Sequence, residues 1–516
     1  MLRTRLPLIA VALLVACGVN PVTGKKELTL VGEGTELQVG AENYAPSRQM
    51  QGGDFTVEPG LTRYVNEVGQ KLAAVSDRKL PYEFTVLNNS VPNAWALPGG
   101  KIAVNRGLLT QLGSEAELAA VLGHEITHAA ARHGAKSMER GMLFQGALVA
   151  LSLGVRDNQY ANLIVGGAQV GAQLVTLRYS REDELEADHY GMVYMKRAGY
   201  DPNAAVELQQ TFVKLEQGKS KGWIDGMLAS HPPSAERVDR NREHAAELGA
   251  GGDLGRERYQ SALADLRRVE PAYKKYDEGV EALKKDDAAR ALSLAEEAAK
   301  IEPREAKFAE LMGDVELKRK NYRAALNHYQ RSLALDSGYF KPYLQSGIAH
   351  YQLGERDKAK PLFARSMELL PTATASYYLG RFAQDAGQTD QALKYYQMAA
   401  GSDSDEGRES ARQIAVLDLP RNPGNYLAVE ARADSKGQVV IAVQNRAQVS
   451  VRAIELRVAI TDAGGHPLQG PVRVSSGNRT LAAGQIIELA TGLGPVTTQA
   501  QLQQVRWQID SAAVAQ

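Results

Sequence analysis

Two histidines and a glutamate inside one predicted helix constrain this 516-residue chain more than any other feature. Residues 121–128 contain the pattern H-E-x-x-H, formed by His124, Glu125 and His128. Side chains four residues apart on a helix project from nearly the same face, about one turn apart. His124 and His128 are therefore spaced to hold one zinc ion. Glu125 falls at the edge of that face, where it can accept a proton from a water molecule without being a ligand.

The flanking residues specify the helix well. Ser114 followed by Glu117 is the pattern of a capping box, and residues 116–131 are rich in strong helix formers. We expect the helix to end near residues 133–134. Taken alone, the pattern also fits ordinary histidines in an alanine-rich helix, so a metal site needs a third ligand from elsewhere.

A second predicted helix, which begins at residues 180–188, offers that ligand. Its Glu184 and Asp188 are again four apart, and they can serve as the third zinc ligand and as a carboxylate partner for a ligating histidine. The alternative is a solvated acidic face, which is our interpretation of Glu182 and Glu186. Small residues line both ligand-bearing stripes and let the two helices approach closely; they are Ala120, Thr127 and Ala131 on the first and Ala187 and Gly191 on the second.

Together these motifs resemble the zinc metalloproteases that include the HtpX membrane protease, the CAAX prenyl endopeptidase and the periplasmic BepA-type proteases. The matching elements are H-E-x-x-H, S-R-x-x-E-x-x-A-D from Ser180, the run at residues 93–102, and S-H-P-P with a later arginine. The resemblance implies a gluzincin-type domain with one Zn²⁺ per chain. It makes Glu184 the third ligand and Asp188 the support of His124.

The resemblance also gives roles to His231 and Arg237. It implies that His231 lies near the metal, either as an inhibitory fourth ligand or as a group that stabilises the oxyanion of the reaction. Arg237 is expected to support the same charge. The other histidines, His133 among them, have no comparable setting, and we interpret them as ordinary.

A strand pattern precedes the first helix. Residues 82–86 alternate as a strand, and residues 94–97 and 101–104 flank the turn Pro98-Gly99-Gly100. The resemblance places this strand and turn at the border of the cleft, so we expect a sheet edge there to bind an extended peptide by strand addition. The predicted substrate-binding residues are Asn93, Ala94, Trp95 and Ala96.

The first 17 residues have the layout of an export signal. Two arginines precede an apolar run that is too short to span a bilayer, and Leu14-Val15-Ala16-Cys17 resembles a bacterial lipobox. Cys17 is the only cysteine, so we expect it to be lipidated and to anchor the protein at the periplasmic face of the outer membrane. A cleaved, soluble periplasmic form is the alternative. Residues 20–53 are expected to form a polar tether and a first helix.

Between the two metal-binding helices lies a Gly/Ala-rich apolar interval, residues 141–177. Two apolar pieces within it are broken by Arg156-Asp157-Asn158-Gln159, and each is short for a membrane span. We expect a lid or an oligomer-packing helix pair. A peripheral membrane contact is the alternative.

Glycines then recur at a fixed period. Gly279, Gly313, Gly347 and Gly380 are 34, 34 and 33 residues apart, and an alanine follows each by 12 residues. This resembles four tetratricopeptide repeats, helix pairs that stack into a solenoid and usually bind a protein partner on the concave face. A plain spacer is the alternative.

From residue 422 the pattern changes to strands. Residues 439–443 form a buried-looking run, and Ile454, Leu456, Val458 and Ile460 alternate with mostly polar residues, as in a small antiparallel β-sandwich. The fold class is therefore multidomain α+β. We expect a signal segment at 1–17, a mainly helical metalloprotease domain with a small sheet at 18–248, a linker helix at 249–271, an α-solenoid of repeats at 272–405 and the β-sandwich at 422–516.

The net charge of the chain gives no support to nucleic-acid binding, because 60 basic residues balance 60 acidic ones. We predict a lipid-anchored periplasmic zinc metalloendopeptidase that hydrolyses peptide bonds in misfolded or misassembled envelope proteins, with a protein partner on its repeats. The alternative is a latent protease that acts mainly as a chaperone or assembly scaffold.

Overall fold

The computed structural model describes residues 17–140, 179–217, 231–249 and 251–515, and the chain divides into two compact units, Met1–Leu370 and Pro371–Gln516. The Gly/Ala-rich interval 141–177 and the apolar run before Cys17 lie outside the described residues. Within the described ranges, no helix has the length and apolar character that a membrane crossing requires.

A three-stranded sheet in the first unit supports the H-E-x-x-H helix. Its order is β3 (Glu83–Leu87), β5 (Lys101–Asn105), β4 (Ala94–Leu97), with β3 parallel and β4 antiparallel to β5. Gly99 and Gly100 in the turn between β4 and β5 have φ angles of 79° and 82°, in the left-handed region that favours glycine. The predicted turn is confirmed, and β4 lies at the edge of the sheet.

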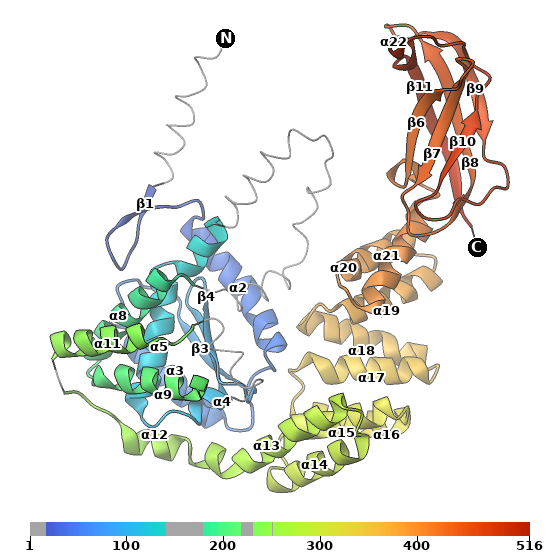
Figure 1. Cartoon of the computed structure of the whole chain (residues 1–516). Helices are drawn as coiled ribbons and strands as arrows, with labels where there is room; N and C mark the ends of the chain where they lie inside the picture. Colours follow the sequence, from blue (N-terminus) through green and yellow to red (C-terminus); the bar gives the residue numbers. More distant parts are fainter. Residues whose placement is uncertain (1–16, 141–178, 218–230, 250, 516) are drawn as a thin grey trace. The chain divides into compact units, whose positions relative to one another are not determined.

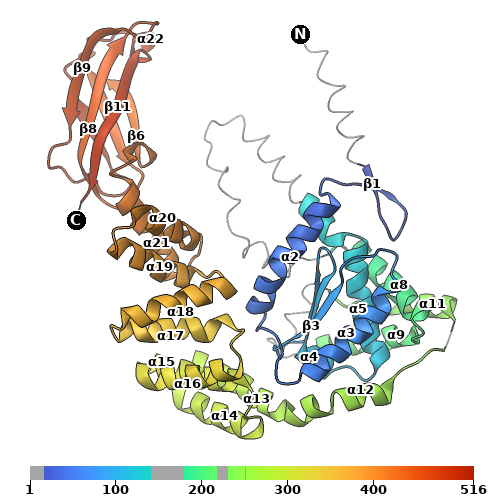
Figure 2. The same cartoon turned by 180° about the vertical axis from the view of Figure 1, so that it is seen from behind.

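Helices cover both faces of this sheet (Figures 1 and 2). On one face, Tyr44 of α2 (Glu33–Met50) packs with Trp95 and Leu97. On the other, α3 (Pro59–Ala73) and α5 (Glu115–Ala130) bury a large apolar cluster against the strands. The segment predicted as a tether forms a hairpin of β1 (Cys17–Val19) and β2 (Lys26–Leu28) before α2 begins.

Besides the helical residues 133–140, four further helices in the described ranges lie around the site. They are α4 (Arg106–Leu109), α8 (Arg181–Arg197), α9 (Asn203–Gln217) and α11 (Ala235–Leu248). Every residue of α5 is buried, so the H-E-x-x-H helix is a core helix whose polar side chains must find partners inside the protein.

The repeats form helix pairs after the connecting helix α12 (Arg256–Ala262). Three pairs belong to the first unit: α13 (Ala264–Lys284) with α14 (Ala288–Ile301), α15 (Ala306–Lys318) with α16 (Tyr322–Leu335), and α17 (Phe340–Gln352) with α18 (Arg356–Leu369). The second unit begins with α19 (Ala373–Asp385), α20 (Thr389–Ala400) and α21 (Asp405–Asp418). The repeated glycines lie on first helices, where Gly313, Gly347 and Gly380 each contact an aromatic ring of the second helix.

Two antiparallel sheets follow, after a short 3₁₀ turn η1 (Pro423–Asn425). One has the order β10-β7-β6 and the other β11-β8-β9, and both contribute to one apolar cluster. Their bounds are β6 (Leu427–Ala433), β7 (Val439–Asn445), β8 (Val451–Thr461), β9 (Pro467–Ser475), β10 (Ile486–Ala490) and β11 (Val505–Val514), with a short helix α22 (Gln499–Leu502) before β11. The predicted alternation in β8 is confirmed, because Ile454, Leu456 and Val458 are buried while Glu455 and Arg457 are exposed.

Candidate metal centre

Local capping fixes where the site helices begin. The Ser114 hydroxyl accepts a hydrogen bond from the Glu117 amide at 3.2 Å, and the Glu117 carboxylate accepts from the Gly113 amide at 2.9 Å. The predicted capping box of α5 is thus only half formed, since its second bond goes to Gly113 instead of Ser114. In α8 a complete capping box joins Ser180 and Asp183. Ser234 caps α11 by accepting from the Arg237 amide at 3.1 Å.

Four buried side chains from three segments of the chain meet at one point. They are His124, His128, Glu184 and His231, whose candidate ligand atoms all lie within 4.8 Å of one another. The Nε2 atoms of His124 and His128 are 3.0 Å apart, and Glu184 oxygens lie 3.5 Å from each of them. His231 Nδ1 lies 2.8 Å from Glu184 Oε1 and 3.3 Å from His124 Nε2.

This donor set fits a metal ion. Four ligands at 2.0–2.1 Å from a tetrahedral zinc would lie about 3.3 Å from one another. Five of the six spacings here run from 2.8 to 3.5 Å, and every pair lies within 4.8 Å. Glu184 Oε2 is buried and forms no hydrogen bond among the described residues, although it is ion-paired with Arg237 Nη1 at 3.0 Å. A cation placed between the two imidazoles and this carboxylate would satisfy all three.

The buried side chains of Asp188 and Arg237 hold His124 and Glu184 in place. His124 Nδ1 lies 2.9 Å from Asp188 Oδ1, and Arg237 donates to both Asp188 oxygens at 2.7 Å. A third contact joins Arg237 to Glu184 at 3.0 Å. Burial would raise the pKa of Asp188, but the charge and hydrogen bonds of Arg237 hold it at about 2. Asp188 is therefore ionised and able to orient His124.

Glu125 lies beside this cluster without joining it. Its side chain is fully buried, His231 Nε2 is 3.7 Å away, and neither carboxylate oxygen has a hydrogen-bond partner among the residues described. Burial raises the pKa of Glu125, which strengthens it as a base. By contrast, Glu184 has a pKa well below its ordinary value, because the charge of His231 and the bonds to three histidines outweigh burial.

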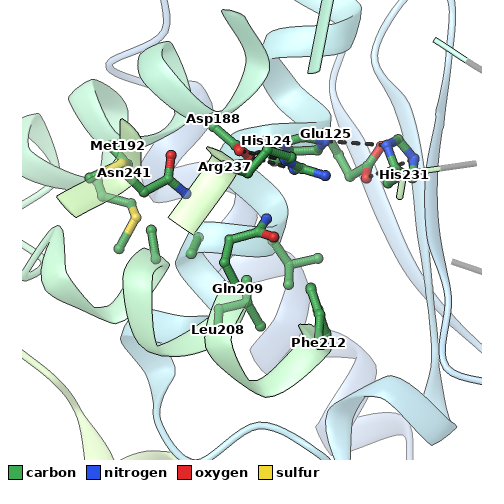
Figure 3. A pocket seen from close by; sticks show the side chains of 14 residues that line it. His124, Glu125, Asp188, Met192, Leu208, Gln209, Phe212, His231, Arg237 and Asn241 are labelled. Atoms are coloured by element: carbon green, nitrogen blue, oxygen red, sulfur yellow. Dashed lines mark hydrogen bonds and ion pairs between the residues drawn. The ribbon is translucent and has the colours of Figure 1, made fainter. Parts of the chain in front are cut away.

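A small pocket borders the site (Figure 3). His124, Glu125, Arg237 and His231 lie on one side of it. Leu208, Gln209 and Phe212 of α9 lie across from them. The buried Gln209 Oε1 has no hydrogen-bond partner among the described residues. The sequence pattern did not point to α9 as part of this wall.

The predicted substrate-binding residues lie in and beside β4. Asn93, Ala94, Trp95 and Ala96 are all buried, and α5 packs against this strand. The Asn93 carbonyl accepts from the Asn105 amide at 2.8 Å, whereas Asn93 Oδ1 and Trp95 Nε1 have no partner among the described residues. Their role in binding peptide stays a prediction.

Three residues near His128 were missed by sequence reasoning. His133, interpreted from the sequence as ordinary, is fully buried and lies 2.8 Å from His128, and Glu186, interpreted as solvated, lies 3.2 Å from His133. Tyr179 stacks on the His128 ring at 3.9 Å. A histidine five residues beyond the H-E-x-x-H pattern was the one signal available for this group.

An H-E-x-x-H helix that faces a glutamate on a second helix, with a free buried carboxylate beside them, is the arrangement typical of a metalloprotease site. Residues 59–245 match the family described as Peptidase family M48, and the chain is a metalloprotease.

Known relatives cover much of the chain. The Beta-barrel assembly-enhancing protease of Escherichia coli K12 is 28% identical over 368 residues, 64% of this chain and 73% of that protein. The same-named protein of Yersinia pestis is 27% identical over 60% of this chain and 71% of its own length. The Mitochondrial metalloendopeptidase OMA1 of Schizosaccharomyces pombe is 34% identical over 36% of this chain and 53% of its own length.

Solved structures of TPR proteins are similar to parts of this chain. The Arabidopsis OM64 TPR domain is 21% identical over 23% of this chain and 98% of its own, with a TM-score of 0.22. The TPR protein YrrB is 17% identical over 32% of this chain and 83% of its own, with a TM-score of 0.26.

Proposed function

We propose that this protein is a zinc metalloendopeptidase whose zinc ion is held by His124, His128 and Glu184. The observation that supports the proposal is that these three side chains lie close together and are buried. Glu125 lies beside them and has no hydrogen-bond partner among the described residues. A structural zinc site would not need such a carboxylate.

The protein's own residues then divide the chemistry. A zinc ion held by these residues would supply Lewis-acid chemistry, because it would lower the pKa of a water molecule toward neutrality and polarise the scissile carbonyl. Glu125 accepts a proton from the attacking water and passes it to the leaving amine. Asp188 keeps the His124 ring oriented, and Arg237 holds Asp188 and Glu184 in place. Arg237 is thus a positioning residue in this proposal.

His231 is proposed to keep the protease latent. Its Nδ1 is part of the four-atom cluster, so it can occupy the corner that substrate or water needs. The competing role, stabilisation of the oxyanion, also requires proximity to the metal. Removal of the imidazole separates the two roles, because a latent enzyme gains activity and an oxyanion-stabilised enzyme loses it.

The physiological role is proposed from the relatives. We infer that the protein acts in the periplasm on misassembled outer-membrane proteins, and its similarity to a relative named Beta-barrel assembly-enhancing protease supports this inference. Lipidation at Cys17, peptide binding along Asn93 to Ala96 of the β4 region, and a protein partner on the repeats belong to the same proposal. The chaperone or scaffold role stays the alternative.

The domain limits are part of the proposal as well. We propose a protease domain at 18–248, a linker helix at 249–271, repeats at 272–405 and a β-sandwich at 422–516. The single apolar cluster shared by the two C-terminal sheets supports a sandwich.

Casein digestion by the full chain tests the enzyme proposal, with zinc content measured for every variant. Glu125→Gln is expected to retain zinc and lose activity by about 10²–10⁴-fold, whereas Glu184→Ala loses the metal. His231→Ala is expected to digest casein faster than wild type. An active Glu125→Gln protein would refute the assignment, and zinc-loaded proteins that all fail to cleave casein or a misassembled outer-membrane protein would favour the scaffold.

A further inference from the structure

A second chain of hydrogen bonds reaches the metal site through His128. His133 Nδ1 lies 2.8 Å from His128 Nδ1, on the side of the ring away from the other ligands. His133 Nε2 lies 3.2 Å from Glu186 Oε1. The three side chains therefore form a continuous line from α8 to the candidate metal position.

A reversal of the backbone brings His133 to this place. Helix α5 ends at Ala130, and Arg132 has a φ of 63°, in the left-handed region. Residues 133–140 then start a new helical segment, so His133 turns back toward His128. A left-handed arginine is strained, and the buried carboxylate of Glu36 holds it by accepting from Arg132 Nε at 3.0 Å.

The donor and acceptor atoms of the three side chains determine where each proton lies along this line. His128 directs Nε2 toward the cluster, and a neutral imidazole that offers a lone pair there must carry its proton on Nδ1. That Nδ1–H can only be donated to the lone pair of His133 Nδ1. His133 must then carry its own proton on Nε2, where Glu186 accepts it.

The surroundings of the three side chains agree with this order. Glu186 is partly buried, and the same Oε1 also accepts a hydrogen bond from Asn20 Nδ2 at 3.2 Å, which helps to fix its carboxylate. Asp183 Oδ1 lies 3.6 Å from His133 Nε2, too far for a good hydrogen bond. The stacked ring of Tyr179 covers His128.

We propose that His133 and Glu186 are positioning residues that fix the tautomer and orientation of His128 for metal binding. They do for His128 what Asp188 does for His124, with one additional imidazole in the line. This inference rests on the proposed zinc site and extends it to two residues that bind neither metal nor substrate.

Zinc affinity of the full chain, measured by competition with a chelator, tests the proposal. His133→Leu removes the acceptor, and we expect zinc binding to weaken by about 10–100-fold. His133→Asn can place an amide oxygen near the former Nδ1, so its affinity should return to within about threefold of wild type. Glu186→Gln, at the partly exposed end, is expected to weaken binding by about 3–10-fold.

The matched control is Glu182→Gln, which neutralises an exposed glutamate in the same helical turn region and should leave zinc affinity unchanged. Melting of the metal-free proteins separates loss of the fold from loss of orientation. If His133→Leu misfolds, the zinc affinity of Glu186→Gln compared with that of Glu182→Gln tests the proposal instead. Wild-type affinity in His133→Leu, or equal affinities for Glu186→Gln and Glu182→Gln, would overturn the relay. Wild-type protein that binds no zinc would refute the proposed function itself.

Discussion

Helices α5 and α8 approach each other closely at two glycines, Gly123 and Gly191. A Cβ atom added to Gly191 would lie 2.9 Å from the His124 amide nitrogen and 3.0 Å from the Gly123 carbonyl carbon. Both neighbours are backbone atoms, so neither can rotate away. Gly191→Ala must therefore push the helix of His124 and His128 away from the helix of Glu184.

Gly191→Ala should change two quantities, the zinc affinity and the unfolding free energy of the metal-free protein. Ordinary contacts between such atoms need about 3.5–4.0 Å, so the helices must separate by about 0.5–1 Å. Metal–ligand distances tolerate only about 0.2 Å, and we expect zinc affinity to fall at least about tenfold, or ~1.4 kcal/mol. Alanine gains about 1 kcal/mol over glycine in a helix, and overpacking costs about 1–3 kcal/mol. The metal-free protein should lose about 0–2 kcal/mol of unfolding free energy.

Chelator competition and denaturant unfolding of the metal-free protein measure the two quantities. Gly34→Ala serves as the control, because Gly34 lies in the first turn of α2, where an added Cβ would have nothing within 4 Å. The control should be neutral or slightly stabilised and bind zinc normally. If Gly191→Ala behaves like Gly34→Ala in both assays, the argument that these glycines set the ligand spacing is wrong.

Two further predictions concern stability away from the metal. Burial, with Asp265 nearby, raises the pKa of Glu58 to about 7 from 4.5, so the folded protein retains a proton that the unfolded chain releases. The unfolding free energy should therefore fall as pH rises through this window. Glu58 is only half-buried and solvent screens its interactions, so Glu58→Gln should remove no more than about 1 kcal/mol of that fall in urea titrations at pH 5 and 8. A Cβ on Gly313 would lie 2.5 Å from the buried Tyr329 ring, against 2.9 Å between Gly347 and Phe363, so thermal melts should rank Gly313→Ala as more destabilised than Gly347→Ala by about 1 kcal/mol. If the unfolding free energies of wild type and Glu58→Gln change equally with pH, the argument about Glu58 is wrong. If Gly347→Ala is destabilised more than Gly313→Ala, the argument about the repeat glycines is wrong.

The sequence was sufficient wherever a short-range period decides the structure. His124, His128, Glu184 and Asp188 could be paired because four-residue spacing on a helix is independent of the rest of the fold. The repeats were equally accessible, since a fixed period of glycines and alanines marks helix pairs. The alternating strand β8 followed from the two-residue period of strands.

His133 and Glu186 escaped prediction because their positions depend on long-range geometry. The left-handed Arg132 turns His133 back toward the site, and arginine carries no sequence signal for that conformation. Its conformation is held by Glu36, almost a hundred residues earlier in the chain. Glu186 sits in an acidic run where a solvated side chain is the usual expectation, and only the folded position of His133 gives it a partner.

Glycine serves opposite purposes in the two helical regions of the first unit. In the repeats, Gly313 and Gly347 face aromatic rings, so the ring fills the space and the paired helices keep an ordinary separation. In the metal centre, Gly123 faces Gly191, and no side chain keeps the two backbones apart. This contact lets ligands from α5 and α8 come within 3.5 Å of each other. A small residue in a helix is therefore informative about function only together with the residue that it faces, which here distinguishes a metal site from a scaffold.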